Sequence, residues 1–258
     1  MPKIKQLVNS LLSTYPPDDF SSQQINSNRY YFDNPSFSWA DGAITQAIIR
    51  SAKPKRIIEV GAGFSTCLIC DVNKNYFNSS IKVTSIDPFI LDYSRFRELI
   101  ESNELEFIQK PVQEIDLELF DALDTGDILF IDSSHVSKAG SDVNWLFFRV
   151  LPRIKQGVLI HIHDVFFPFD YPADWLAGGR SWNEVYLLRA FLQFNDSFQM
   201  FLMNNAVGIN SRLLSEQARI IFEKNSGGSV WLFRARDNDQ SEKDSRYVNY
   251  LQLLNFTD

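Results

Sequence analysis

The stretch that decides the fold spans Arg56 to Thr66 and reads RIIEVGAGFST. It begins as an apolar, β-branched run of strand length, turns at Gly61-Ala62-Gly63 and continues with residues compatible with a helix. An α/β sheet presents a nucleotide site in this way, at the carboxyl end of its first strand. The glycines lack a Cβ, so the backbone can turn sharply and approach a ligand closely. Glu59 is costly to bury without a partner, which makes it a candidate binding residue.

Two classes of cofactor use such a turn. A dinucleotide fold has a third glycine three residues after the second, and this chain has Thr66 there. The acidic strand end also suits a cationic, phosphate-free ligand better than a pyrophosphate, which Glu59 would repel. A lone GxG is weak evidence, so a turn that only closes a strand-to-helix connection stays the alternative.

Glu59, Gly61 and Gly63 resemble the first motif of the class I S-adenosylmethionine-dependent methyltransferases, which has the form acidic residue, x, Gly, x, Gly. The resemblance implies that these three residues, with Phe64 and Ser65, bind S-adenosylmethionine.

Composition limits the classes of partner. The 258 residues suffice for one α/β domain with additions or for two small domains, and 45% of them are hydrophobic, enough for a full core. A net charge of -7 without a sustained basic run argues against nucleic acid and favours a small molecule. No apolar run approaches the roughly 20 residues of a membrane helix, and the N-terminus lacks the features of a signal peptide. We therefore expect a cytoplasmic protein with no membrane partner.

The two cysteines, Cys67 and Cys70, have the CxxC spacing of redox and metal sites. Leu68 and Ile69 lie between them, and the run falls inside the helix after the glycine turn. Buried helix residues are therefore favoured over a redox pair.

Residues 1–42 form an N-terminal arm. A short amphipathic helix is predicted over Ile4 to Leu12, and an aromatic segment follows at residues 30–39. Asp41 is predicted to cap the helix Ala43 to Ala52. We favour packing of the arm's aromatic residues on the sheet; the alternatives are a part in covering an active site and contacts in a homo-oligomer.

From Arg56 onward, strand-like and helix-like stretches alternate, which predicts a parallel sheet with helices on both faces. The resemblance implies a Rossmann-like seven-stranded sheet in a domain over residues 43–236, with strand order 3-2-1-4-5-7-6 and an antiparallel last strand. A polar tail, 237–258, would follow. After the first strand, the predicted strands are Lys82–Asp87, Leu105–Val112, Asp127–Asp132, Val158–Asp164, Phe198–Asn205 and Ser229–Ala235. The predicted helices after strands two, three, four, five and six are Asp92–Glu101, one ending at Leu123, Lys138–Leu151, Trp182–Phe194 and Leu213–Lys224.

Asp87 ends the second strand just over 20 residues past the glycine turn, where an adenosine ribose would present its hydroxyls. The alternative is an aspartate that caps the following helix. Val112 and Gln113 end the third strand, and the resemblance implies that they lie beside the adenine.

Polar residues also end the fourth and fifth strands. Asp132 is followed by Ser133, Ser134 and His135, and Asp164 ends the fifth strand. Alternation sends His161 and His163 to one face. All three histidines of the chain therefore lie at the ends of neighbouring strands.

These strand ends resemble most closely the macrocin-type O-methyltransferase branch, in which strand four ends in Asp-x-x-His and strand five in an aspartate before a long loop. Asp132, His135 and Asp164 match that pattern. The chain departs from the commoner form at Ser133, where a glycine is usual, and in carrying His163 beside Asp164.

Methyl transfer to oxygen requires alignment of the acceptor and removal of a proton. We assign His135 as general base, Asp132 as a further catalytic and cofactor-binding residue, and Asp132 and Asp164 as ligands of Mg²⁺ or another divalent cation, with His163 as a candidate third ligand. The alternative is that these residues only cap helices. Three further pocket candidates carry less weight: Asp142, Arg180 and Glu184.

The loop 165–181 is too aromatic for an ordinary connection and is predicted to be a lid or pocket wall, or else a separate hydrophobic cluster. The sequence thus predicts an S-adenosylmethionine-dependent methyltransferase acting on a hydroxyl of a small-molecule or sugar-containing acceptor. The alternatives are a non-catalytic S-adenosylmethionine-binding module, a metal-free methyltransferase that uses His135 alone, and a nicotinamide-dependent oxidoreductase.

Overall fold

The computed structural model describes residues 2–25, 28–89, 93–209 and 211–235, which form one seven-stranded sheet with the order β3-β2-β1-β4-β5-β7-β6. Strands β1 to β5 are parallel, and β7 runs antiparallel to both β5 and β6. The predicted Rossmann-like fold and strand order are confirmed. The strands are β1 Arg56–Val60, β2 Lys82–Ile86, β3 Glu106–Ile108, β4 Ile128–Ile131, β5 Leu159–Ile162, β6 Phe198–Met203 and β7 Val230–Arg234.

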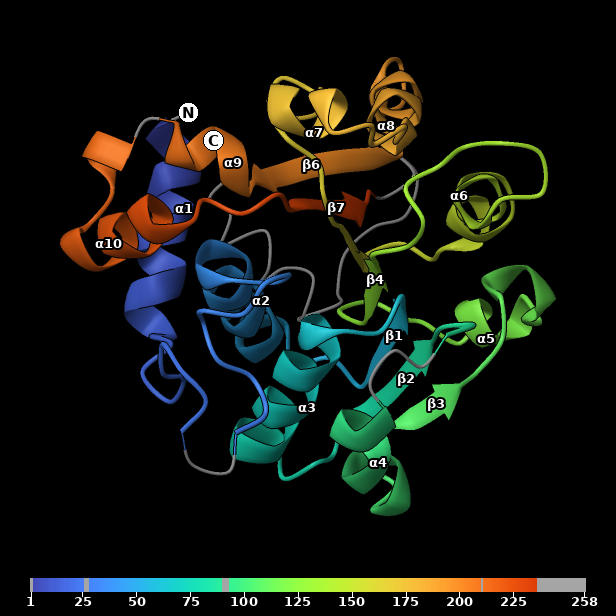
Figure 1. Ribbon diagram of the computed structural model, residues 1–258, viewed down its shortest axis with the longest axis horizontal. Coiled ribbons are helices and arrows are strands. Elements are labelled where there is room, and N and C mark those ends of the chain that lie inside the picture. Colours follow the sequence, from blue (N-terminus) through green and yellow to red (C-terminus); the bar gives the residue numbers. More distant parts are fainter. Residues whose placement is uncertain (1, 26–27, 90–92, 210, 236–258) are drawn as a thin grey trace, which may run out of the picture.

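Helices cover both faces of the sheet, and each face has its own hydrophobic core. Figure 1 shows α1, α2, α3, α4 and α10 on one side of the sheet and α5 and α6 on the other. The first core takes residues from α1 (Pro2–Thr14), α2 (Trp39–Ala52), α3 (Phe64–Phe77), α4 (Tyr93–Glu101) and α10 (Glu216–Lys224). The second takes residues from α5 (Glu118–Asp121), α6 (Asp142–Trp145) and α8 (Glu184–Leu192). Two short helices, α7 (Ala173–Ala177) and α9 (Asn204–Gly208), complete this part of the chain.

Strand register brings the predicted polar residues to one edge. Val60 pairs with Ile86 on one side and Ile131 on the other, and Ile131 pairs with Ile162. The residues that follow these partners, Gly61, Asp87, Asp132 and His163, therefore stand at the same level. The order of the strands reverses at β1, and ligands of open α/β sheets bind at such a point.

The N-terminal arm is fastened to α3. The Asp71 carboxylate accepts hydrogen bonds from the backbone N–H of Arg29 (2.6 Å) and of Tyr30 (2.8 Å). Tyr30 and Phe37 are buried, and the Tyr30 hydroxyl donates to the Phe37 carbonyl. These aromatic side chains pack in the core, the interpretation that the sequence favoured. Cys67 and Cys70 are likewise buried in α3, as the sequence favoured.

The predicted role of Asp41 as a helix cap is wrong. Helix α2 begins at Trp39 with Ser38 as its N-cap residue, and Asp41 is buried in the first turn. Its carboxylate accepts hydrogen bonds from Asn204 Nδ2 (3.0 Å), Gly228 N (3.1 Å) and Ser229 Oγ. Asp41 therefore forms hydrogen bonds with residues from the C-terminal part of the chain in place of the predicted capping hydrogen bond.

Two further element boundaries differ from the prediction. Strand β3 is only three residues long and ends at Ile108, where its partner β2 also ends, and Val112 to Glu114 form a 3₁₀ turn. The helix expected from Lys138 starts at Asp142, where the Ser141 hydroxyl accepts from Asn144 N; it continues as a π-helical turn over Leu146–Val150. The shift leaves 132–141 as an irregular segment after β4.

No helix of the described residues is long and apolar enough to cross a membrane. The cytoplasmic location stays a prediction, as do homo-oligomer formation and the predicted domain boundaries. The predicted polar tail lies outside the described residues.

Gly61 is the glycine that the turn requires. Its φ is +94°, and a Cβ at this position would lie 1.7 Å from the Asp132 carbonyl oxygen, whereas a Cβ on Gly63 would meet nothing within 4 Å. We expect Gly61→Ala to lower the free energy of unfolding by at least about 2 kcal/mol, and Gly63→Ala by much less. Urea denaturation of both variants measures the difference. Equal losses would contradict the described turn.

Candidate active site

Glu59 lies beneath the glycine turn and is fully buried. Its carboxylate accepts hydrogen bonds from the hydroxyls of Ser65 (2.7 Å), Thr66 (2.6 Å) and Ser85 (2.8 Å). The Thr66 oxygen also accepts from Gly63 N (3.0 Å), so the residue that replaces a dinucleotide glycine ties the turn to the acid. The partners of Glu59 are therefore hydroxyls of the protein, and Glu59 is not among the residues that line the cavities described below.

A cavity of about 410 Å³ opens beside this turn, at the carboxyl ends of β1, β2 and β4. Five of the residues predicted to bind the cofactor line it: Gly61, Asp87, Val112, Gln113 and Asp132. The other predicted residues do not line it. The Phe64 ring packs edge-on against Tyr31, with 5.4 Å between the ring centroids. The Ser65 hydroxyl donates a hydrogen bond to Glu59, and the Gly63 backbone N–H donates one to the Thr66 hydroxyl. We name this space the cofactor cavity.

Asp87 is held in place by the chain around it. One carboxylate oxygen accepts from Ala62 N (2.9 Å) in the glycine turn and the other from Phe89 N (2.7 Å). Each oxygen keeps a lone pair for a ligand hydroxyl. Phe89, which sequence reasoning missed, lines the same cavity and is 71% exposed. Its position, as an aromatic residue two positions after the acid that ends the strand, is the signal in the sequence that could have identified it.

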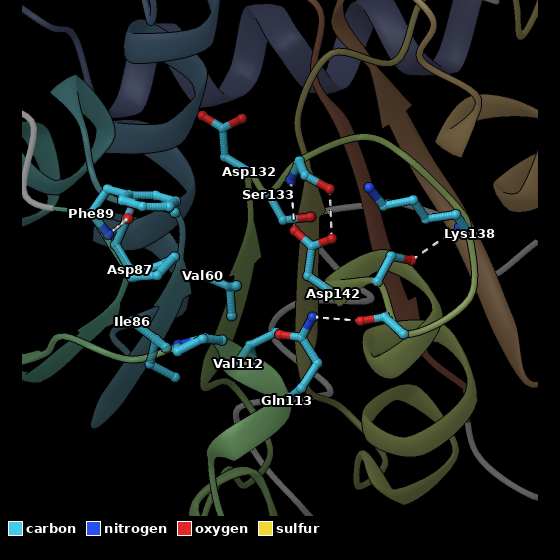
Figure 2. Close-up of a pocket in the computed structure, with 16 residues that line it drawn as sticks. Val60, Ile86, Asp87, Phe89, Val112, Gln113, Asp132, Ser133, Lys138 and Asp142 are labelled. Carbon is cyan, nitrogen blue, oxygen red and sulfur yellow. Dashed lines mark hydrogen bonds between the residues drawn. The ribbon is translucent and has the colours of Figure 1, made fainter.

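The opposite wall of the cofactor cavity carries Lys138 and Asp142, as Figure 2 shows. Asp142 accepts from both the backbone N–H (2.8 Å) and the hydroxyl (2.5 Å) of Ser134. Gln113 donates to the Gly140 carbonyl at 2.9 Å. These hydrogen bonds hold the irregular segment after β4 beside the cavity.

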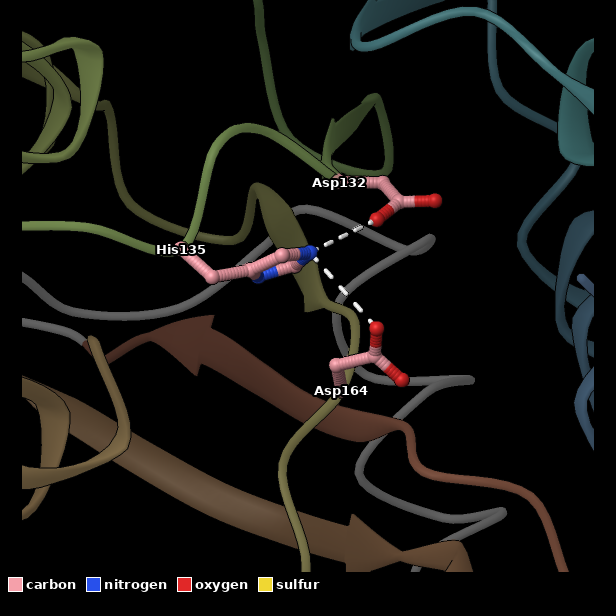
Figure 3. Close-up of side chains that lie close together, drawn as sticks. All are labelled: Asp132, His135 and Asp164. Carbon is pink, nitrogen blue, oxygen red and sulfur yellow. Dashed lines mark ion pairs between the residues drawn. The ribbon is translucent and has the colours of Figure 1, made fainter. Parts of the chain in front are cut away.

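Asp132, His135 and Asp164 converge at the edge of the sheet (Figure 3). His135 Nε2 lies 3.3 Å from Asp132 Oδ1 and 3.6 Å from Asp164 Oδ2, and one ligand atom from each residue falls within 4.8 Å of the others. Both His135 (φ +59°) and Asp164 (φ +56°) have left-handed backbones. Such strain is characteristic of functional sites.

Glu184 orients the histidine from behind. Its Oε2 lies 2.9 Å from His135 Nδ1, and both residues are buried. A carboxylate at Nδ1 keeps the proton there, so Nε2 is the nitrogen that faces the two aspartates. Glu184, a weaker candidate from sequence, is thus joined to the cluster.

Electrostatic interactions within the cluster shift the pKa values of its members. Burial disfavours the imidazolium of His135, but hydrogen bonds with Asp132 and Glu184 outweigh it and raise its pKa to about 10. Burial also opposes ionisation of Asp132, and the nearby His163 and His135 overcome it and lower its pKa to about 2. His135 is therefore protonated at neutral pH, and it can act as a base only after losing this proton.

His163 lies beside the cluster and not within it. Its Nε2 is 3.6 Å from Asp164 Oδ1, and its Nδ1 is 3.4 Å from Ser229 Oγ. The third candidate metal ligand beside Asp132 and Asp164 is His135, whereas the sequence suggested His163. His161 shares the face of His163, as alternation predicted, and stacks on Phe130 at 3.8 Å between ring centroids.

A second cavity, of about 560 Å³, borders the cluster on the other side of Asp132. Distant segments build it, which is why sequence reasoning missed several of its residues. Its walls come from the arm (Pro35, Ser36, Ser38), from α2 (Asp41), from the segment between β5 and α8 that includes α7 (Phe166, Trp175, Arg180, Trp182) and from the turn before β7 (Asn225, Gly227, Gly228). The aromatic loop is a pocket wall, and we name this space the acceptor cavity.

Residues 58–165 match the family described as a methyltransferase domain. The match begins inside β1, includes the glycine turn and ends just after Asp164. This match covers less than half of the chain, and it agrees with the resemblance of the glycine turn to the class I S-adenosylmethionine-dependent methyltransferases. An uncharacterized protein of Archaeoglobus fulgidus is 38% identical over 95 residues, which are 37% of this chain and 42% of that protein. The match thus spans less than half of that relative.

Solved structures with similar folds include methyltransferases. The S-adenosylhomocysteine-bound methyltransferase PaMTH1 of Podospora anserina has a TM-score of 0.46 and 14% identity, covering 91% of this chain and 88% of its own. CmcI with magnesium and S-adenosylmethionine has a TM-score of 0.41 and 17% identity, covering 78% and 73%. A Geobacter sulfurreducens methyltransferase has a TM-score of 0.43 and 13% identity, covering 90% of each chain. All three TM-scores are below 0.5.

Burial raises the pKa of Glu59 to about 7, against the opposing effect of its three hydroxyl partners. The folded protein thus holds this proton more tightly than the unfolded chain does, whose carboxyl has the ordinary pKa of about 4.5. The resulting stability is fully present below about pH 4.5 and is lost as the pH rises through about 7, by at most about 1.4 kcal/mol per pH unit. We expect Glu59→Gln to gain stability relative to the unmodified protein between pH 5 and pH 8.

Urea denaturation at a series of pH values measures this gain. Glu101→Gln, at an exposed position of α4, is the matched control and should follow the unmodified protein. Parallel pH profiles for Glu59→Gln and the unmodified protein would contradict the raised pKa.

Proposed function

We propose that this protein transfers the methyl group of S-adenosylmethionine to a hydroxyl of a small-molecule acceptor, with a divalent cation at Asp132, His135 and Asp164. The observation that carries this proposal is the position of Asp132, which lines both the cofactor cavity and the acceptor cavity. A methyl donor in one cavity and a hydroxyl in the other would meet beside this residue.

The cofactor cavity suits an adenosine-containing cation. Asp87 offers carboxylate oxygens to ribose hydroxyls, and Phe89, Ile86 and Val112 offer apolar surface to a base. Asp132 adds negative charge where a sulfonium would lie. The acidic wall disfavours the pyrophosphate of a dinucleotide, which also supports the methyltransferase over an oxidoreductase.

The donor set at the cluster suits a divalent cation. Glu184 holds the His135 Nδ1 proton, so Nε2 would present a lone pair between two carboxylates once its own proton leaves. Two oxygens and one imidazole nitrogen suit Mn²⁺, Fe²⁺ or Zn²⁺, and Mg²⁺ with water completing its shell. A bound cation would lower the pKa of the acceptor hydroxyl and orient it.

The acceptor is a small molecule on this proposal. A cavity of about 560 Å³ lies within the usual range of small-ligand sites, and the aromatic loop and the arm enclose it. His135, Asp132 and Asp164 stand at one end of this space, where the reacting hydroxyl would sit. The residues that enclose the cavity would then choose the acceptor.

The test is a calorimetric titration of S-adenosylhomocysteine into the protein with Mn²⁺, with Mg²⁺ and with chelator, repeated on Asp87→Ala. We expect binding in every case, at least about tenfold weaker in Asp87→Ala because ligand hydroxyls lose a charged partner. Asp116→Ala, at an exposed position, is the control. A separate titration of Mn²⁺ should give a binding heat that chelator abolishes.

The outcomes separate the alternatives. No binding of S-adenosylhomocysteine under any condition would overturn the proposal. S-adenosylmethionine that stays unconsumed across a panel of hydroxyl compounds would favour a binding module. A metal-free enzyme would show turnover that chelator leaves unchanged and that His135→Ala abolishes.

A further inference from the structure

The wall of the acceptor cavity carries an arginine that packs against two tryptophan rings. The Arg180 guanidinium carbon lies 3.9 Å from the ring centroid of Trp175 and 4.7 Å from that of Trp182. The two rings meet edge to face, 5.4 Å apart at 87°. Arg180 therefore sits in an aromatic corner that restricts its plane.

This corner is fixed to the candidate metal site. The Trp182 ring also contacts the His135 ring, at 4.3 Å between centroids. Directly after Trp182, the backbone N–H groups of Asn183 and Glu184 both donate to the His135 carbonyl, at 3.0 and 3.1 Å. Trp182 thus contacts both the guanidinium and the cluster, and its ring lines the cavity beside both of them.

The charge of Arg180 is not neutralised within the described part of the chain, where it forms no ion pair with a carboxylate. Among the lining residues of the acceptor cavity it is the one Arg or Lys. The other ionisable side chains there are Asp41, Asp132, Asp164 and two histidines. A guanidinium with free N–H groups is suited to a planar oxyanion, which it binds through two parallel hydrogen bonds.

We propose that the acceptor is a hydroxylated ring compound that carries a carboxylate, and that Arg180 binds this carboxylate while the hydroxyl lies at Asp132, His135 and Asp164. This inference rests on the proposed function and names its substrate class. The ring of the acceptor lies along Trp182. A carboxylate is favoured over a phosphate because the cavity already holds three aspartates, which repel a dianion more strongly than a monoanion.

The experiment compares the binding of three probes to the full chain saturated with S-adenosylhomocysteine: 4-hydroxybenzoate, its neutral amide 4-hydroxybenzamide, and phenyl phosphate. Calorimetry is run with chelator and again with Mn²⁺, so that binding of a carboxylate to metal alone is recognised. The variants are Arg180→Gln, Arg180→Lys and, as a matched control, Arg189→Gln at an exposed position of α8.

We expect 4-hydroxybenzoate to bind at least about tenfold more tightly than the amide, with chelator as well as with Mn²⁺. Arg180→Gln should remove this preference, Arg180→Lys should retain part of it, and Arg189→Gln should leave it unchanged. Equal binding of acid and amide, no binding of either, or a preference that persists in Arg180→Gln would overturn the inference. So would tighter binding of phenyl phosphate.

Binding of S-adenosylhomocysteine in the same samples separates this inference from the proposed function. If it binds to Arg180→Gln as it does to the unmodified protein, the variant is folded and a lost preference for the acid reports on Arg180. If it binds while the acid is not preferred, the substrate class alone is wrong. If it does not bind to the unmodified protein, the proposed function fails first.

Discussion

The close approach of the first glycine turn to the end of β4 is the constraint on which the rest of the site depends. Asp132 N donates to the Val60 carbonyl at 2.8 Å, and the Asp132 carbonyl occupies the place that a side chain on residue 61 would need. Only a residue without a Cβ lets the two strand ends meet. This contact places Asp132 between the two cavities, where it can face a cofactor and an acceptor at once.

Buried acidic side chains are the second feature of the site, and each of them has its own hydrogen-bond or ion-pair partners. Glu59 is surrounded by hydroxyls, which hold the turn and partly oppose the burial that raises its pKa to about 7. Asp132 and Asp164 face His135. Asp41 is held by Asn204, Ser229 and a backbone N–H. Unpaired burial of such groups would be costly, so these networks also define where polar chemistry is possible.

Much of the fold was predictable because its signals are local. The strand, turn and helix at residues 56–66 and the alternation of apolar runs predicted a parallel sheet covered by helices, and the family resemblance implied the strand order that is observed. Strand ends also predicted that Asp87, Asp132, His135 and Asp164 lie at one edge, because parallel strands share their carboxyl edge. The orientation of Glu59 was not predictable, since its partner Ser85 comes from another strand.

The acceptor cavity could not be predicted from sequence periodicity. Asp41 resembles a helix cap in the sequence, yet its partners are more than 160 residues away. The choice of His135 over His163 as third member of the cluster depends on the left-handed backbone at residue 135, which no pattern of residue types announces. Such features depend on tertiary contacts between distant segments.

Separate titrations of S-adenosylmethionine and Mn²⁺ into Asp132→Asn test whether Asp132 serves both cavities. Asp164→Asn, which changes a residue of the acceptor cavity alone, is the comparison. We expect Asp132→Asn to weaken the binding of both ligands and Asp164→Asn to weaken mainly that of Mn²⁺. Unchanged affinity of Asp132→Asn for either ligand would contradict the shared position of this residue.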